Sequence, residues 1–342
     1  MVTAYSFPNF TRPSNNMSSI LDHSIVGLGN PLLDISASVS DEFLAKYKLK
    51  MDNAILAGDE HLPMYDEITK DFQAEFIAGG ATQNSIRVAQ WMLKSHSAKA
   101  TSFFGCVGKD AYGKVLRDCA EKDGVNEGER SLVANLSAAN KFELAHLDDE
   151  RSKDIINKAK FFYSAGFHLT VCPDAIMKLA EHATFSNKVF LLNLSAPFIT
   201  QFFKDPLLAA MHHADFVFGN EAEATEFGNA HGWGDDLAIV ALRLSQLPKA
   251  SGARCRTVIF TQGAKPTIVV HNGELKLIEV PTLDQSEIVD TNGAGDAFVG
   301  GFISQLARDK SIQKSVEAGH WAAQVVIRRS GCTLPETCEY TD

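Results

Sequence analysis

Residues 290–296 read Asp-Thr-Asn-Gly-Ala-Gly-Asp and run directly into a small and apolar stretch, 297–302. We expect a helix that begins at Gly293, and the first N–H groups of a helix have no partner inside it. The helix dipole adds roughly half a positive charge, so this end would bind phosphate or a developing oxyanion. Asp296, one turn inside, could take a proton from an alcohol there. A tight turn before an ordinary helix is the alternative, but the acid at each end and the small-residue helix favour function.

Length and composition indicate a globular protein with one large domain. The chain has 342 residues, of which 45% are hydrophobic and 22% charged, enough for a sizeable core. Its net charge of -10 argues against a broad nucleic-acid-binding surface. The six cysteines include no Cys-x-x-Cys pair, which favours a reducing compartment. We expect a cytoplasmic protein, with the nucleus as a second location, and no membrane partner, since no apolar run reaches transmembrane length.

Strand and helix patterns alternate from residue 24 onward, after a flexible extension at 1–22. Short apolar runs that alternate with helices predict an α/β domain over 23–342, with a mostly parallel sheet covered by helices on both faces. In such folds ligands bind beyond the carboxyl ends of the strands. The expected strands are 24–29, 76–80, 100–107, 161–165, 189–194, 216–219 and 257–261, and the clearest helices are 81–94 and 112–122.

Some strand-like segments do not fit this alternation. Residues 33–39, 53–56 and part of 124–136 predict a small separate sheet that forms a lid over the ligand edge. Residues 267–271 and 276–280 predict a hairpin, because the Asn-Gly pair between them suits a type I′ turn.

Two early segments carry candidate ligand contacts. Asn30 and Asp34 follow the first strand, where an amide and a carboxylate could bind the paired hydroxyls of a ribose; an Asx turn is the alternative. Gly79 and Gly80 precede a helix that carries Asn84, and a glycine pair lets a ligand approach the backbone closely. A Gly-rich turn of this kind is a weak signal alone.

Later segments have a structural explanation beside the functional one. Asn220 and Glu223 could order magnesium-bound water or simply cap a helix. Thr261 and Gly263 could line a nucleotide site or only end a strand. Arg130 could reach a phosphate or lie free on the surface. Phe167 and Phe198 could stack on a base or pack in the core, and His168 and His320 are weaker candidates by the same logic.

Together, five segments resemble the ribokinase-like carbohydrate kinase family. The resemblance extends from about residue 22 to 335 and rests on the segments 29–35, 78–91, 193–198, 218–221 and 290–301. It implies a ribokinase-like fold and phosphoryl transfer from magnesium-ATP to the 5′-hydroxyl of adenosine, giving AMP in purine salvage. It also implies that Asp296 is the base and that the amides of Gly293, Ala294 and Gly295 form the anion hole.

The resemblance assigns further roles by position. The implied contacts are Asn30, Asp34, Gly79, Gly80 and Asn84 on the ribose; Leu132, Ala134, Phe167 and Phe198 around the purine; Asn220 and Glu223 on magnesium, the latter through water; Thr261, Gly263, Asn292 and His320 near ATP; and Arg130 on the phosphates. Because the family often has Phe at His168, stacking there is expected to be altered or lost. Activation by potassium occurs in related kinases and is a further expectation.

One departure from the family lies between the helix that ends near Lys122 and Arg130. The family has two lid strands there, which need roughly 12–15 residues, whereas this chain has only 124–129. We expect weaker closure over the substrate and a monomer, because a lid-mediated dimer loses its strands. Two alternatives stay open: a kinase for a sugar or another nucleoside, and a nucleoside-binding protein with little turnover. At its reference pKa near 3.9, Asp296 would be ionised at neutral pH and a weak base.

Overall fold

The structure is a computed structural model, and it describes residues 20–37, 39–49, 59–94, 96–97, 99–122, 126–127 and 136–341. The expected lid strand 53–56 lies outside the described residues, as do residues 1–19 of the predicted extension and Arg130, Leu132 and Ala134. Within the described ranges, no helix is both long enough and apolar enough to cross a membrane.

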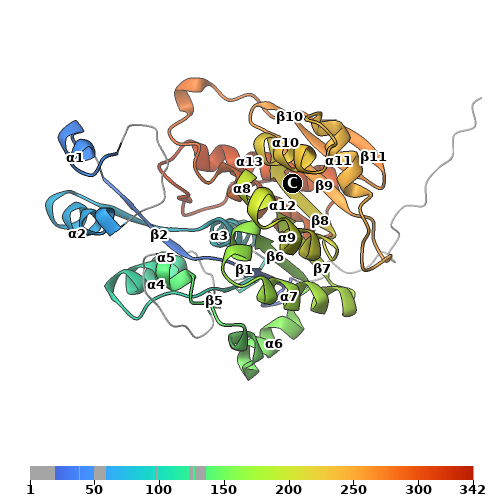
Figure 1. Cartoon of the computed structure of the whole chain (residues 1–342), viewed down its shortest axis with the longest axis horizontal. Helices are drawn as coiled ribbons and strands as arrows, with labels where there is room; N and C mark the ends of the chain where they lie inside the picture. Colours follow the sequence, from blue (N-terminus) through green and yellow to red (C-terminus); the bar gives the residue numbers. More distant parts are fainter. Residues whose placement is uncertain are drawn as a thin grey trace, which may run out of the picture.

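A mixed but mostly parallel sheet forms the centre of the described structure (Figure 1). Its strands are β1 (Ile25–Leu28), β4 (Thr101–Phe104), β5 (Asn126–Glu127), β6 (Phe161–Ala165), β7 (Val189–Asn193), β8 (Phe216–Asn220), β9 (Thr257–Gln262), β10 (Lys265–His271) and β11 (Glu274–Ile278). Their order is β11-β10-β9-β8-β7-β6-β1-β4-β5. Neighbours from β5 to β9 pair in parallel, whereas β9, β10 and β11 pair antiparallel, which confirms the predicted architecture.

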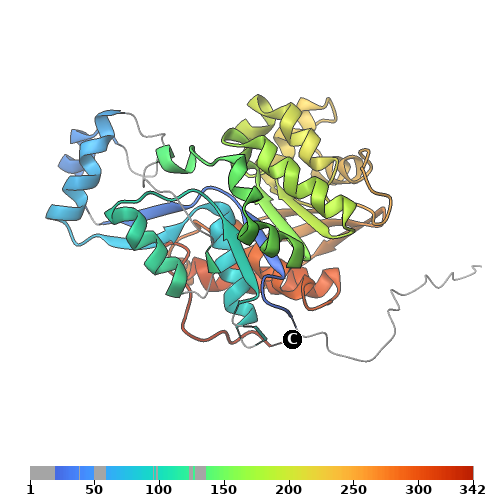
Figure 2. The same ribbon diagram turned by 90° about the horizontal axis from the view of Figure 1, so that it is seen from below.

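Helices cover both faces of this sheet, and Figure 2 shows the two layers on either side of the strands. Val26 and Leu28 of β1 join the core of one layer, while Ile25 joins that of the other, as the period of two in a strand requires. The first layer contains α6 (Glu150–Lys158), α7 (Pro173–Phe185), α8 (Pro197–Phe202), α9 (Lys204–Met211), α10 (Glu221–Ala230) and α11 (Leu237–Ser245); the second contains α3 (Ala81–Leu93), α12 (Ala294–Leu306) and α13 (Ile312–Ile327).

A separate two-stranded sheet projects from one side of the molecule (Figures 1 and 2). It pairs β2 (Leu32–Ser36) with β3 (Glu75–Gly79) antiparallel, and α4 (Ala111–Lys122) packs against it. The expected lid strand at 33–39 is therefore present. The placement of 76–80 in the main sheet was wrong, because a short apolar run before a helix does not reveal which strand it pairs with. The lid side also carries η1 (Asp59–His61), α1 (Asp41–Lys46) and α2 (Leu62–Asp71).

The expected lid segment 124–136 contributes no strand to the small sheet where the structure describes it. Residues 126–127 extend the main sheet as β5 beside β4, and Leu136 begins a short helix, α5 (Leu136–Ala139), although we predicted strand as far as this residue. The remaining short helices are η2 (Leu144–Asp148), η3 (Gly166–Thr170) and η4 (Gln285–Glu287).

The turn between β10 and β11 has the predicted geometry. Asn272 and Gly273 have φ values of 52° and 78°, the left-handed pair that a type I′ turn requires.

The point where the chain reverses its direction of travel across the sheet lies at β1. From β1 the chain runs to β4 and β5 on one side, and then crosses back to β6 and continues to β9 on the other. A crevice forms at such a switch point, beyond the carboxyl ends of the strands, and this is where open α/β sheets bind ligands.

Candidate active site

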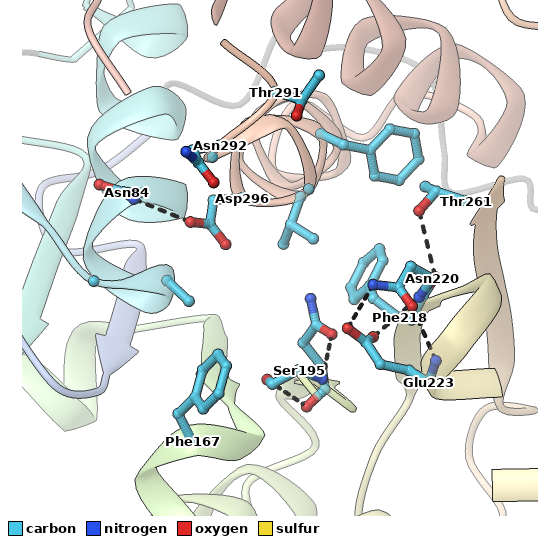
Figure 3. Close-up of a pocket in the computed structure, with 18 of the residues that line it drawn as sticks. Asn84, Phe167, Ser195, Phe218, Asn220, Glu223, Thr261, Thr291, Asn292 and Asp296 are labelled. Carbon is cyan, nitrogen blue, oxygen red and sulfur yellow. Dashed lines mark hydrogen bonds between the residues drawn. The ribbon is translucent and has the colours of Figure 1, made fainter. Parts of the chain in front are cut away.

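A cavity of about 500 Å³ lies at the carboxyl ends of the strands (Figure 3). It is lined from the lid side by Leu32 and Gly80, from the sheet by Asn193 and Phe218, and from α12 by Asp296. Segments far apart in the sequence therefore meet at the predicted place. The other lining residues that matter below are Asn84, Phe167, Ser195, Asn220, Glu223, Thr261, Thr291, Asn292, Gly293 and Gly295.

The start of α12 points free amides into this cavity. Gly293 is the N-cap residue with φ 76°, a left-handed conformation that favours glycine, and a Cβ added there would lie 3.0 Å from Cys332 Cβ. The Ala294 N–H already donates to Thr291 O at 3.3 Å, so its share in the predicted anion hole is reduced. The N–H groups of Gly293, Gly295 and Asp296 have no backbone acceptor in the described part of the chain. These are the donors that an anion would find.

Asp290 organises the loop before this helix. Its Oδ1 accepts the Asn292 N–H at 2.8 Å, and its Oδ2 accepts the Gly331 N–H at 2.9 Å. The first acid of the run therefore ties the anion-binding loop to the segment after α13. It holds donors in place, whereas Asp296 faces the cavity.

Asp296 is held by an amide from the opposite wall. Asn84 Nδ2 donates to Asp296 Oδ2 at 3.0 Å (Figure 3). Arg87, which is buried on the same helix as Asn84, donates to Asn84 Oδ1 at 3.2 Å and so fixes the amide. Burial raises the pKa of Asp296 to about 7, and the charges of Asp34 and Glu223 act in the same direction against the Asn84 hydrogen bond. The expectation of an ordinary, fully ionised Asp was wrong, because the sequence does not show this burial.

The glycine pair before α3 is required by close contacts. Gly80 has φ 94°, and a Cβ there would lie 2.2 Å from Asn30 O. A Cβ at Gly79 would lie 2.3 Å from Asp34 Oδ2. Because neither site has room for a side chain, the two glycines pack directly against Asn30 and Asp34. Of these four residues only Gly80 lines the cavity, so the ribose contacts of Asn30, Asp34 and Gly79 stay predictions.

Two aromatic rings lie on the segments that follow β6 and β7. Phe167 lines the cavity, and its ring centroid is 6.1 Å from that of Phe198, which is 41% exposed on α8. His168 is fully buried, bonds Asn30 Oδ1 and meets Phe142 edge-on, so it takes no part in stacking at the cavity. This agrees with the expectation that stacking at His168 is altered or lost, because the backbone turn of η3 directs neighbouring side chains to opposite sides.

Asn220 and Glu223 form a complete capping box and also line the cavity. Glu223 accepts from Asn220 N at 3.0 Å and from Asn220 Nδ2 at 2.8 Å, while Asn220 Oδ1 accepts Glu223 N at 2.9 Å. Burial raises the pKa of Glu223 to about 7, although hydrogen bonds from the Asn220 and Ser195 backbones oppose the shift. With both oxygens already engaged, this carboxylate suits a metal held through water, as Mg²⁺ commonly is.

Two further predicted residues stand back from the cavity. Gly263 is exposed after β9 with φ 59°, and does not line the cavity, whereas Thr261 does. His320 is buried behind Phe298, its Nε2 2.8 Å from Thr267 Oγ1, and burial lowers its pKa to about 4. Their proximity to ATP stays a prediction.

The described wall of the cavity carries carboxyls but no Lys or Arg. No three His, Cys, Asp or Glu side chains gather anywhere in the described ranges to form a metal centre. Among the described residues a phosphate here would meet the backbone amides, and the predicted contact from Arg130 lies outside the described residues.

Sequence reasoning assigned no role to several residues of the site. Ser195 has φ 71°, unusual for Ser, and its Oγ accepts the Gly166 N–H at 2.7 Å, which joins the loops after β6 and β7. Asn193 Oδ1 accepts the Ser195 N–H at 2.9 Å. Their position at a strand end was the available signal. Arg87 gave none, because an Arg on an amphipathic helix normally lies in solvent.

Free amides at a helix start, a carboxyl of raised pKa beside them and a cavity at the strand ends define a site for phosphoryl transfer to an alcohol. The chain belongs to the pfkB family of carbohydrate kinases, whose model matches residues 41–127 and 125–338. It is a phosphotransferase with an alcohol acceptor and ATP as co-substrate, and such kinases generally need a divalent metal. The two matched ranges overlap at 125–127, within the segment 124–129 for which we predict a shortened lid.

Comparisons with individual proteins agree. Adenosine kinase 2 of Arabidopsis thaliana is 52% identical over 343 residues, which cover 94% of this chain and 99% of that protein. The crystal structure of Anopheles gambiae adenosine kinase in complex with P1,P4-di(adenosine-5) tetraphosphate has a TM-score of 0.85 at 41% identity, covering 94% of this chain and 100% of the other. Adenosine kinase from Schistosoma mansoni in complex with adenosine and AMP has a TM-score of 0.82 at 34% identity, covering 94% of this chain and 100% of the other.

Proposed function

We propose that this chain is an adenosine kinase, which transfers the γ-phosphate of ATP to the adenosine 5′-hydroxyl and releases AMP and ADP. The observation that carries the proposal is the meeting of Asp296 and the α12 amides with Gly80 and Asn84 of the opposite wall in one cavity. Proteins named adenosine kinases match this chain over nearly their full length, and this supports the same substrate.

In this mechanism Asp296 accepts the proton of the 5′-hydroxyl as the oxygen begins to bond phosphorus. A base with a pKa near 7 is better matched to neutral pH than an ordinary carboxylate. The free amides of Gly293 and Gly295 stabilise the negative charge on the transferring phosphoryl group, a contribution at least as large as that of the base. Asn84 keeps the carboxyl pointed at the acceptor.

The remaining contacts follow from the same proposal. Asp34 accepts the ribose hydroxyls, Phe167 and Phe198 contact the purine, and Thr261 and Asn292 lie on the ATP side. Glu223 and Asn220 would hold Mg²⁺ through water, and the ion would supply charge neutralisation to the phosphates. We further propose a cytoplasmic monomer; potassium activation is tested by assays with and without K⁺.

An acceptor panel tests the proposal. ADP release is measured with magnesium-ATP and adenosine, inosine, ribose or fructose, with Asp296→Asn as the inactive control. Adenosine should have the highest kcat/KM. Phosphorylation of a sugar without adenosine would favour a sugar kinase, and adenosine binding in calorimetry without ADP release would favour a binding protein. The same panel on a chain in which 124–129 is replaced by the corresponding segment of the Arabidopsis relative measures what the short lid costs in KM.

A further inference from the structure

His168 is a buried imidazole next to the wall of the proposed nucleoside site. It lies on η3 next to Phe167, which lines the cavity, and it is fully buried. Its Nδ1 is 2.7 Å from Asn30 Oδ1, and its ring packs edge-on against Phe142 with centroids 5.1 Å apart. The contact joins the end of β1, where the chain reverses, to the turn after the neighbouring strand β6.

The hydrogen bonds of Asn30 determine where the imidazole proton lies. Asn30 Nδ2 donates to the Phe167 carbonyl oxygen at 3.3 Å. A carbonyl only accepts, so the amide nitrogen must face Phe167 and the amide oxygen must face His168. The imidazole nitrogen opposite that oxygen therefore carries the proton, and the tautomer is Nδ1–H.

The surroundings of the ring keep it neutral. Burial lowers the pKa of His168 to about 3, so the ring carries one proton throughout the neutral pH range. Nε2 has no hydrogen-bond partner in the described part of the chain. A buried acceptor without a partner is unfavourable. Within the described residues, the bond to Asn30 is therefore the one hydrogen bond of this imidazole.

This arrangement leaves Asn30 with one defined way to meet a ligand. Its oxygen is occupied by His168 and one N–H by Phe167, and no acceptor in the described residues takes its second N–H. Asn30 can therefore offer a donor. Asp34, when ionised, can only accept. A donor and an acceptor together complement a hydroxyl group, which accepts one hydrogen bond and donates another.

We propose that His168 is a positioning residue, which holds the Asn30 amide so that it donates to a ribose hydroxyl oxygen and so selects acceptors that carry that hydroxyl. This inference rests on the proposed nucleoside kinase function and names the device that orients one of its contacts. Without the imidazole N–H, the amide oxygen is free to turn toward the same hydroxyl and compete with Asp34.

Steady-state kinetics of adenosine phosphorylation test the proposal. His168→Phe removes the N–H and should raise KM for adenosine about 5- to 10-fold, the effect of one lost hydrogen bond, while kcat and the KM for ATP stay within about twofold. His168→Asn keeps an N–H donor on the same branch and should restore most of the affinity. His213→Phe is the matched control, because its Nδ1 also bonds a side-chain oxygen, Thr184 Oγ1 at 2.9 Å, away from the cavity. Melting temperatures report any loss of folding.

Two further comparisons separate positioning from packing. Adding His168→Phe to Asn30→Ala should change KM no further, because both act through one contact. The KM values for 3′-deoxyadenosine and 2′-deoxyadenosine, compared with that for adenosine, should show which ribose hydroxyl the wild-type protein recognises and the His168→Phe variant no longer recognises. An unchanged KM in His168→Phe, or effects that multiply in the double variant, would overturn the proposal.

A measurement without substrate separates this inference from the proposed function. In the ligand-free wild-type protein, the ¹⁵N shifts of the His168 ring should report Nδ1–H and bare Nε2 at pH 6 to 8. The Nε2–H tautomer overturns the inference whatever the enzyme phosphorylates. If the wild-type protein fails to phosphorylate adenosine, the proposed function is refuted instead. The variant series is then measured with the acceptor that the protein does phosphorylate.

Discussion

At the scale of single residues, the site depends on what surrounds each acid. Asp290 and Asp296 end the same seven-residue run, yet one accepts two backbone N–H groups and the other faces a cavity opposite Asn84. Burial and neighbouring charges raise the pKa of Asp296 to about 7. Two identical side chains therefore have different surroundings: Asp290 holds the loop, and Asp296 is the one that we propose as the base.

Replacing the base tests its assignment. Asp296→Asn keeps the shape but cannot accept the proton, so kcat should fall by orders of magnitude while the adenosine Kd from calorimetry changes by less than about threefold. Melting curves serve as the folding control. Near-normal turnover would rule out Asp296 as the base.

The raised pKa of Asp296 predicts the pH dependence. The base is active when deprotonated, so kcat/KM should fall about tenfold per pH unit below about pH 7 and level off above it. Asn84 donates to the carboxylate and stabilises its charged form. Asn84→Ala should therefore shift the fall in kcat/KM to higher pH, whatever its effect on the constant value of kcat/KM at high pH. A limb near pH 4 in the wild-type protein would contradict the burial argument.

Asp290 should matter through the loop it holds. Asp290→Ala leaves the N–H groups of Asn292 and Gly331 without their acceptor, so we expect a loss of about 1–3 kcal/mol in the free energy of unfolding and a lower kcat. The KM for adenosine should change little, because Asp290 lies on the loop and not on the ribose side. Urea unfolding and steady-state kinetics check both parts.

At the scale of elements, α12 combines an anion-binding start with very close packing. A Cβ at Gly300 would lie 2.5 Å from Ser85 O on α3, and one at Gly301 would lie 2.6 Å from Ala318 O on α13. The small residues after the Asp-Thr-Asn-Gly-Ala-Gly-Asp run are thus a packing requirement. They let α12 pack closely against α3, which carries Asn84, and so place Asn84 opposite Asp296.

A substitution in this interface tests the requirement. Gly300→Ala should destabilise the protein by about 1–3 kcal/mol, because the added methyl forces backbone apart in a close-packed core, and it should lower kcat by displacing Asn84 from Asp296. Gly252→Ala is the control, since a Cβ there has open space within 4 Å and the expected change is within about 0.5 kcal/mol. Equal stability of the two variants would contradict the packing argument.

At the scale of the whole molecule, the cavity exists because the chain reverses at β1. The loops after β1, β6, β7 and β8 and the start of α12 meet there, from segments up to about 260 residues apart in sequence. A ligand that binds only the folded arrangement must therefore stabilise all of it.

Adenosine should raise the stability of the whole domain. At 100 times its Kd it should add about 2.7 kcal/mol to the free energy of unfolding, seen as a single upward shift of the melting transition. Ribose alone at the same concentration should add much less, because it makes no contact with Phe167. No shift with adenosine would contradict the proposed site.

Much of this could be predicted from sequence because it depends on local patterns. The strand–helix alternation, the Asn272-Gly273 turn, the helix beginning after Gly293 and the capping box at Asn220 follow from residues near in sequence. The partner of β3, the pKa of Asp296, the buried role of Arg87 and the contact between His168 and Asn30 do not, because each depends on residues brought together by the fold.

The sequence alone indicated the family, the run proposed to bind the anion and most of the residues proposed for the site, since these are properties of short segments and their order. The tertiary structure alone decided that Asp296 has a raised pKa, that Ala294 already uses its amide, and that His168 orients Asn30 and does not stack on a base. The physical reason is that burial, charge proximity and hydrogen-bond partners are set by distances in space, which local patterns do not contain.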